Sequence, residues 1–245
     1  MTTTSSTPVA IRPTVAGRAL RVVRRYGTLI GLLLIIVIFA IASPTVFLSP
    51  INLRNVLEQM AVLTVIASVQ TAVMVVGDFD LSVGACASFS AIVAAVALHG
   101  GVPVPMAVVL ALAAGALIGL VNGFLVAYIG LSAFIATLAS MTSIIGLAFI
   151  LSGGTTLIGF PAEFLAIGQG RLLGLPYTVF IAALVLIVMS VVLSRTTLGR
   201  TFYAIGGNSH AAELSGVNVS RARFTAFIIV GVGSALGGIF LVSRL

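Results

Sequence analysis

The chain has 245 residues, of which 60% are apolar and only 7% are charged. A soluble domain is typically about 45–50% apolar and about 25% charged, so this composition excludes a soluble enzyme, a nucleic-acid binder and a disordered protein. A membrane-spanning helix needs about 20 mostly apolar residues, so seven such helices would use about 140 residues. We therefore expect an all-α, polytopic helical membrane protein with about seven transmembrane helices.

The ionisable and nucleophilic residues do not suggest an enzyme. The net charge is +7, and all twelve basic residues are arginines. The one cysteine, Cys86, lies in an apolar segment, so we expect no internal disulfide and no metal site built from cysteine. The two histidines, His99 and His210, are far apart in the chain. With only five acidic residues, we expect no catalytic cluster, no metal and no cofactor in this chain.

Residues 1–27 are predicted to form a polar cytoplasmic tail. The tail carries five arginines, which are Arg12, Arg18, Arg21, Arg24 and Arg25. The apolar run after it, from Thr28 to Phe47, is longer than the core of a cleaved signal peptide, which has about 7–15 residues. We therefore predict a signal-anchor helix that begins a single transmembrane domain over residues 28–245.

Six further spans are predicted between turn signals rich in glycine, proline and aspartate. They are expected at 56–76, 81–98, 104–128, 133–151, 176–194 and 224–242. Two longer connections remain, at 152–175 and 195–223. Because lipid-exposed irregular backbone is not tolerated in hydrocarbon, these connections must lie in water or within protein.

The distribution of arginine predicts the orientation in the membrane. If the N-terminus is cytoplasmic, the inside segments hold nine arginines, five in the tail and four in the connection 195–223. The outside segments then hold three, Arg54, Arg171 and Arg244. Cytoplasmic segments of membrane proteins carry an excess of basic residues, so this orientation agrees with the positive-inside rule. We expect the connection 152–175 to lie outside and the connection 195–223 to lie in the cytoplasm.

Glycines at four-residue spacing predict close packing between helices. Gly115, Gly119 and Gly123 lie in the span 104–128, and Gly233 and Gly237 lie in the last span. Small residues at this spacing let two backbones approach closely, which favours association of helices in lipid. The pattern predicts a tightly packed bundle and says nothing about the transported solute.

Polar residues on the span 56–76 are candidates for a translocation path. They are Gln59, Thr64, Ser68, Gln70 and Thr71. The three hydroxyl residues share one helical face, and the two glutamines share a neighbouring face. The alternative is that the hydroxyls bond to carbonyl groups of their own helix one turn back. Further candidates on other spans are Asn122, Thr137, Ser140 and Thr142.

The stretch 77–84 places two of the five acidic residues between two spans with almost no loop. A charge at membrane depth is costly and is usually paired or functional. Asp80 can instead accept hydrogen bonds from the free N–H groups at the start of the next helix, where a negative charge is also favoured. We favour this capping role for Asp80, and proton coupling by Asp78 or Asp80 is the alternative.

The cytoplasmic connection 195–223 is predicted to contain a short helix at 210–215. Asn208 or Ser209 can cap this helix, and Gly216 can end it in a left-handed conformation. Such a short helix is marginal by itself, so we infer that it lies in a groove of a partner. The alternative is a loop without a function.

These stretches resemble the permease subunits of ribose-type ABC sugar importers. Residues 77–84, Gly-Asp-Phe-Asp-Leu-Ser-Val-Gly, resemble the family signature Gly-Gly-Ile-Asp-Leu-Ser-Val-Gly, with Asp78 where a second glycine is usual. Residues 197–217 are similar to the cytoplasmic coupling loop of the family, and a looser match covers 153–176. The candidate residues at this signature and helix break are Gly77, Asp80, Ser82 and Gly84, which match it, and Asp78, which departs from it. The matching coupling residues are Gly199, Arg200, Gly206, Gly207, Asn208, Ala211, Ala212, Glu213 and Gly216.

The resemblance implies a transport subunit of an ATP-driven importer in the bacterial plasma (inner) membrane. It implies a second permease chain in the lipid bilayer, forming a homodimer or a heterodimer. It also implies an ATP-binding cassette subunit that hydrolyses ATP-Mg, and a periplasmic or extracellular sugar-binding protein that meets the connection 152–175. The short cytoplasmic helix would dock in a groove of the ATPase. The sequence has no phosphate-binding loop of the Walker type, which agrees with ATP hydrolysis in a partner.

The resemblance also implies a longer chain, because family members continue beyond Leu245 with more spans and a second glycine-rich signature. One alternative function is that of an ion-coupled secondary transporter of a small solute, which would use a broken helix and titrate Asp78, Asp80 or Glu58. The other alternative is a truncated fragment that does not transport.

Overall fold

The computed structural model describes the backbone of residues 15–245 and the side chains of residues 24–245. The chain divides into two compact units, one up to Leu53 and the other from Arg54 to Leu245. In the first unit, α1 (Val15–Ala42) is one continuous helix, and α2 (Pro44–Phe47) comes after it. The segment Arg24–Ala42 is long and apolar enough to cross a membrane. The predicted tail is thus helical from Val15 onward, and residues 1–14 lie outside the described part.

Long apolar helices make up the second unit, and their positions confirm the predicted spans. They are α3 (Pro50–Val76), which leads into this unit, α4 (Val83–His99), α5 (Val104–Ala127), α6 (Ala133–Ser152), α8 (Tyr177–Arg195) and α11 (Val219–Val242). With 17 residues, α4 is shorter than the other predicted spans and measures about 25 Å at about 1.5 Å per residue. Residues 24–245 therefore contain six helices of membrane-spanning length and this shorter apolar one.

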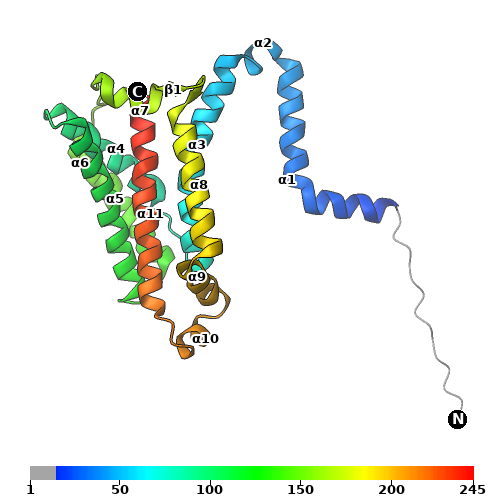
Figure 1. Cartoon of the computed structure of the whole chain (residues 1–245), viewed down its shortest axis with the longest axis vertical. Coiled ribbons are helices and arrows are strands. Elements are labelled where there is room, and N and C mark those ends of the chain that lie inside the picture. Colours follow the sequence, from blue (N-terminus) through cyan, green and yellow to red (C-terminus); the bar gives the residue numbers. More distant parts are fainter. Residues whose placement is uncertain (1–14) are drawn as a thin grey trace, which may run out of the picture. The chain divides into compact units, whose positions relative to one another are not determined.

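Both long connections are structured, and they lie at opposite ends of the bundle (Figure 1). The connection after α6 contains α7 (Ala162–Gln169) and a two-stranded hairpin of β1 (Arg171–Leu172) and β2 (Leu175–Pro176). The connection after α8 contains α9 (Thr197–Gly207) and α10 (Ser209–Leu214). The short helix α10 confirms the prediction at 210–215 to within one residue. The helices α7 and α9 were not predicted from the sequence.

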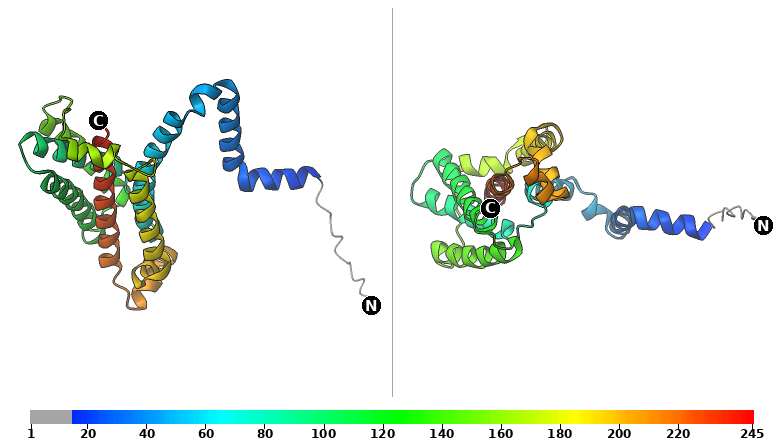
Figure 2. Two further views of the ribbon diagram at one scale, coloured as in Figure 1. Left: turned by 45° about the horizontal axis from the view of Figure 1, so that its top comes forward. Right: turned by 90° about the horizontal axis from the view of Figure 1, so that it is seen from below.

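The last helix, α11, lies between α5 and α8 and packs through its small residues (Figure 1 and Figure 2). A methyl group added to Gly115 of α5 would overlap the carbonyl oxygen of Gly231, and one added to Gly119 would come within 2.5 Å of the carbonyl oxygen of Phe227. On another face, Gly233 contacts Val69 of α3. These backbone-to-backbone contacts confirm the predicted close packing, which in lipid depends on small residues because apolar burial gives no net drive.

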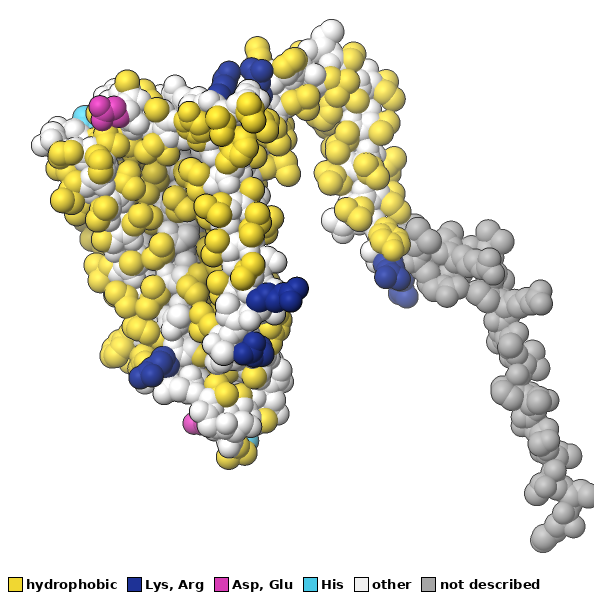
Figure 3. Space-filling model, in the orientation of Figure 1, with side chains coloured by type: hydrophobic (Ala, Val, Ile, Leu, Met, Phe, Trp, Pro, Cys, Tyr) yellow, Lys and Arg dark blue, Asp and Glu magenta, His cyan; other side chains and the backbone are white. Residues whose placement is uncertain are grey.

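The surface of the second unit reflects a membrane environment (Figure 3). Apolar side chains cover the flanks of the long helices, and charged side chains gather near the two ends. Large apolar residues such as Leu117, Ile150 and Leu184 are more than half exposed on these flanks. In water such patches would be unusually extensive, whereas in a bilayer they are the expected contact with lipid.

Candidate functional site

The break between α3 and α4 lies at the predicted signature. The N–H of Gly77 donates to the Met74 carbonyl, and the N–H of Asp78 donates to the Val73 carbonyl at 3.1 Å. Gly77 has a φ of 94°, a left-handed conformation that is strained for other residues. These two bonds with a left-handed glycine form a Schellman motif, which ends α3 cleanly. The chain is then free to turn into the bundle before α4 starts.

Asp80 lies within this break and is only 3% exposed. Its Oδ1 accepts hydrogen bonds from the Ser82 N–H at 2.7 Å and from the Ser82 hydroxyl at 2.6 Å. Ser82 immediately precedes the first residue of α4. Asp80 therefore bonds to the residue that precedes α4, and not to an N–H group within the first turn of α4 as the capping role predicted.

Side chains from α3, α5 and α6 hold the break in place. The amide Nδ2 of Asn122 on α5 donates to the Ser82 hydroxyl at 2.8 Å, and Ser140 of α6 donates to Asn122 Oδ1. From α3, Gln70 Nε2 donates to the Asp80 carbonyl at 3.1 Å. From α6, Thr137 accepts a bond from the N–H of Leu81 at 3.1 Å. Residues far apart in the chain thus meet in one buried polar network.

Other candidates for the path do not join this network. The Ser68 hydroxyl donates to the Thr64 carbonyl at 2.6 Å, and Thr71 donates to the Ala67 carbonyl at 2.9 Å. This is the local bonding that the sequence analysis gave as the alternative. Thr142 bonds in the same way to Ala139, and Gln59 is exposed on α3. Gln70, Asn122, Thr137 and Ser140 are therefore the polar candidates that the fold brings together.

Asp78 forms an ion pair that the sequence analysis missed. Arg223, the fifth residue of α11, approaches it with Nε 3.0 Å from Oδ2 and with a second nitrogen 3.1 Å from Oδ1. The contact to Oδ1 is a charge-assisted hydrogen bond, whereas Nε and Oδ2 are close without hydrogen-bond geometry. Burial raises the pKa of Asp78, and the charge and hydrogen bond of Arg223 oppose that rise. The sequence offered one signal for this ion pair: Asp78 and Arg223 carry opposite charges and lie just outside the ends of predicted spans.

A polar cavity of about 450 Å³ adjoins this ion pair. Asp78, Phe79 and Arg223 form one side, and the short link between α5 and α6 forms the other. A larger apolar groove of about 530 Å³ lies among α4, α5 and α6. The polar cavity is the one that borders the signature and a charged pair.

The connection after α8 is built from two capped helices. The Thr196 hydroxyl accepts the N–H of Gly199 at the start of α9, and Asn208 Oδ1 accepts the N–H of Ala211 at the start of α10. Gly216 has a φ of 84° after the end of α10, as predicted. On α10, Ala212 is buried, whereas Leu214 is 78% exposed. An exposed leucine on a short helix outside the bundle suits contact with another protein.

The first of these helices, α9, packs directly on the end of α3. Phe202 and Ile205 are buried in the same apolar cluster as Val73 and Val76. A methyl group added to Gly206 would overlap the Val75 carbonyl oxygen. The sequence-predicted coupling residues and the signature residues are therefore in contact through Gly206, although they were identified as separate stretches.

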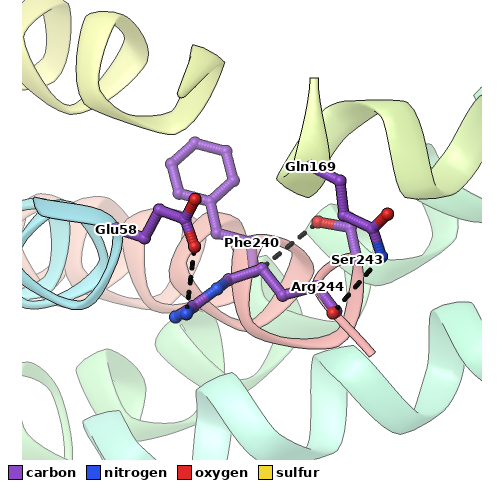
Figure 4. A network of polar contacts seen from close by, with 5 residues as sticks. All are labelled: Glu58, Gln169, Phe240, Ser243 and Arg244. Atoms are coloured by element: carbon purple, nitrogen blue, oxygen red, sulfur yellow. Dashed lines mark hydrogen bonds and ion pairs between the residues drawn. The ribbon is translucent and has the colours of Figure 1, made fainter. Parts of the chain in front are cut away.

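The opposite end of α11 carries a second ion pair (Figure 4). Arg244 lies 3.1 Å from Glu58 Oε2 of α3, and its carbonyl accepts a bond from Gln169 of α7 at 3.4 Å. Gly168 packs so closely on Ser243 that an added methyl group would lie 2.7 Å from its backbone. Glu58, a candidate for titration, is therefore engaged in a structural contact.

The described side chains offer no obvious metal centre. Among the residues described, no three histidine, cysteine, aspartate or glutamate side chains gather into a group that could hold an ion. Cys86 is buried, and its Sγ lies 3.6 Å from the Gly231 carbonyl.

Comparison with known proteins places the chain in a family. Residues 52–245 match the family described as the permease component of the branched-chain amino acid transport system. The chain belongs to this permease family. The match begins within α3 and runs through the signature, both connections and α11.

Relatives of this permease include several sugar importers. The chain is 37% identical to the ribose import permease of Bacillus subtilis over 91% of its own length and 70% of the relative. It is 38% identical to the ribose import permease of Escherichia coli K12 over 89% of this chain and 69% of the relative. It is 33% identical to an L-arabinose ABC transporter permease of Azospirillum brasilense over 99% of this chain and 72% of the relative. The resemblance to sugar ABC importer permeases is confirmed. No solved structure matches the chain.

Proposed function

We propose that this permease subunit belongs to an ATP-driven importer that carries a monosaccharide into the bacterial cell. The family membership supports a transport subunit, and the names of its relatives support a sugar as the solute. The N-terminus is in the cytoplasm of a cell bounded by a plasma (inner) membrane, as the arginine distribution predicts. A second permease chain completes the pathway.

The solute path runs along the broken helix between α3 and α4. Here the buried network offers amide and hydroxyl groups, which are the partners that sugar hydroxyls use. One acceptor remains available, because Gln70 Oε1 is buried with no hydrogen-bond partner among the described residues. A sugar hydroxyl that donates to this oxygen would relieve an unsatisfied polar group, which is costly to bury.

The cytoplasmic helices couple this path to an ATPase subunit that binds ATP-Mg. The observation that carries the proposal is α10, a capped helix outside the bundle with Leu214 and Glu213 exposed. Since a helix of six residues is marginal by itself, a groove on a partner would stabilise it. At the other end, α7 and the hairpin offer a structured surface for an external sugar-binding protein.

Co-purification tests this proposal. The chain is expressed with its candidate ATPase subunit, extracted in mild detergent and passed over a sizing column, as wild type, as Glu213→Arg and as Glu163→Arg. Glu163 is an exposed glutamate in the first turn of α7, so it makes the same charge reversal at the opposite end. We expect wild type and Glu163→Arg to co-elute with the ATPase and Glu213→Arg to elute alone. A folded wild type that never co-elutes would contradict the proposal.

A further inference from the structure

The helix break and the cytoplasmic connection meet at one place in the fold. Asp78 is the last residue of the Schellman motif that ends α3, and Arg223 lies in the first turns of α11, immediately after the connection. Their side chains join the two segments, which are 145 residues apart in the sequence. Any movement of α9 and α10 relative to the bundle therefore acts on both sides of this ion pair.

The contact beside the ion pair is too close to absorb movement. Gly206 of α9 lies against the backbone of Val75 and Val76 without space for a side chain, and a methyl group added to Gly77 would lie 4.0 Å from its Cα. Packed backbones transmit displacement rather than deforming continuously. A shift of α9 would therefore move the end of α3 with it, whereas Arg223 moves with α11.

The surroundings of the ion pair allow it to open. Its side chains are 33% exposed for Arg223 and 9% exposed for Asp78, and they border the polar cavity of about 450 Å³. An ion pair that keeps access to water can separate without leaving a charge fully buried, which is the main cost of breaking buried pairs. The cavity also gives Phe79, which is half exposed, room to move.

The ion pair between Glu58 and Arg244 provides an internal reference. It joins the same two helices at their other ends, with a similar distance of 3.1 Å and similar burial. It lies far from α9 and α10, beside α7 (Figure 1 and Figure 4). A purely structural role would make the two pairs equivalent.

We infer that Asp78 and Arg223 are positioning residues for transport, which hold the helix break to the start of α11 and make the break move with the cytoplasmic helices. This inference rests on the proposed function, because the movement of α9 and α10 comes from the ATPase subunit. The inference adds a role for the ion pair itself. Packing between α9 and α3 is not sufficient, and the break follows the movement of α9 and α10 only when Asp78 and Arg223 are paired.

The test is a cysteine reporter in the break. Phe79→Cys is made in a Cys86→Ala background, and the complex with the ATPase subunit is labelled with a maleimide, with and without a non-hydrolysable ATP analogue. We expect the nucleotide to change the labelling rate by about fivefold or more, a typical size of coupling between two sites. Asp78→Asn and Arg223→Gln should each abolish this change, and the reversed pair Asp78→Arg/Arg223→Asp should restore it.

Glu58→Gln is the matched control, and it should keep the nucleotide response. Three results would overturn the inference: an unchanged response in Asp78→Asn, an equal loss in Glu58→Gln, or no response in the reporter with the intact pair. Co-elution separates this inference from the proposed function. If no complex forms with the intact ion pair, the proposed function and the inference are both wrong. If the complex forms but the nucleotide changes the labelling rate equally with and without Asp78, only the inference is wrong.

Discussion

An ion pair joins α3 to α11 at each end of this helix pair, but the surroundings of the two ion pairs differ. At each end an arginine of α11, or just after it, meets an acidic residue of α3, or just after it. At each end a glycine from a connecting helix also packs on backbone, Gly206 at one end and Gly168 at the other. The two ends differ in the backbone beside the acidic residue, because Glu58 lies within a regular helix whereas Asp78 leads into a buried break. An arginine–carboxylate ion pair therefore joins α11 to a regular helix at one end, and it lies beside the break between α3 and α4 at the other end.

The largest expected effect comes from filling the close contact at the cytoplasmic end. Gly206→Ala places a methyl group on the Val75 carbonyl oxygen, so α9 must move away from α3. We expect a loss of about 1–3 kcal/mol in the free energy of unfolding, as for other overpacked sites, measured by thermal unfolding in detergent. Gly207→Ala is the control, because a methyl group there meets nothing within 4 Å.

Gly168→Ala sharpens the comparison between the two ends. It should destabilise the protein about as much as Gly206→Ala, since it also meets backbone. Only Gly206→Ala should weaken co-elution with the ATPase subunit. Equal co-elution of both variants would show that the position of α9 is unimportant for assembly.

An intermediate effect is expected at Asp80. Removing its acceptor in Asp80→Ala leaves the Ser82 N–H and hydroxyl without their partner. Loss of a hydrogen bond of this kind costs about 0.5–1.5 kcal/mol, which denaturant or thermal unfolding would show. Asp80→Asn keeps an oxygen acceptor and should retain most of the stability and the uptake. If Asp80→Asn folds normally and abolishes uptake, the ion-coupled alternative gains support instead.

The smallest effect concerns Asp78 and pH. Because burial raises its pKa, the unfolded chain loses the Asp78 proton at a lower pH than the folded chain does. As pH rises through this interval, the stability contributed by Asp78 decreases, and it levels off once the folded carboxyl has ionised. Asp78→Asn should remove this decrease, because the amide does not titrate.

Thermal unfolding of wild type and Asp78→Asn from acidic to neutral pH measures this difference. Identical pH profiles would contradict it. A small stability change would also show that a lost nucleotide response in Asp78→Asn does not come from unfolding.

The spans and the cap of α10 could be predicted from the sequence because both depend on local patterns. Apolar runs determine where a helix can cross lipid, and Asn208 and Gly216 act on residues within one or two turns. The polar face of α3 predicted only some of the residues that join the buried network. Gln70 joins the network, but Ser68 and Thr71 bond within their own helix, which no spacing rule distinguishes.

Contacts between distant segments could not be predicted in this way. The ion pair of Asp78 with Arg223 depends on the close approach of α3 and α11, which the glycine contacts of α11 determine. The sequence shows only two charges near helix ends. The helix α9 was missed because glycines at 199, 206 and 207 suggest a loop, whereas two of them are needed for close packing. The Thr196 cap was the local signal for its start.

The order of donors in the buried network has a consequence for its electrostatics. Ser140 donates to Asn122, Asn122 donates to Ser82, and Ser82 donates to Asp80. Every dipole in this series points its positive end toward the same carboxyl group, so the bonds polarise one another in one direction. A negative charge on Asp80 is thus solvated by three neutral side chains in line. The fixed direction also means that exchanging the oxygen and nitrogen of Asn122 would set the amide oxygen against the Ser82 oxygen, whose hydrogen is donated to Asp80.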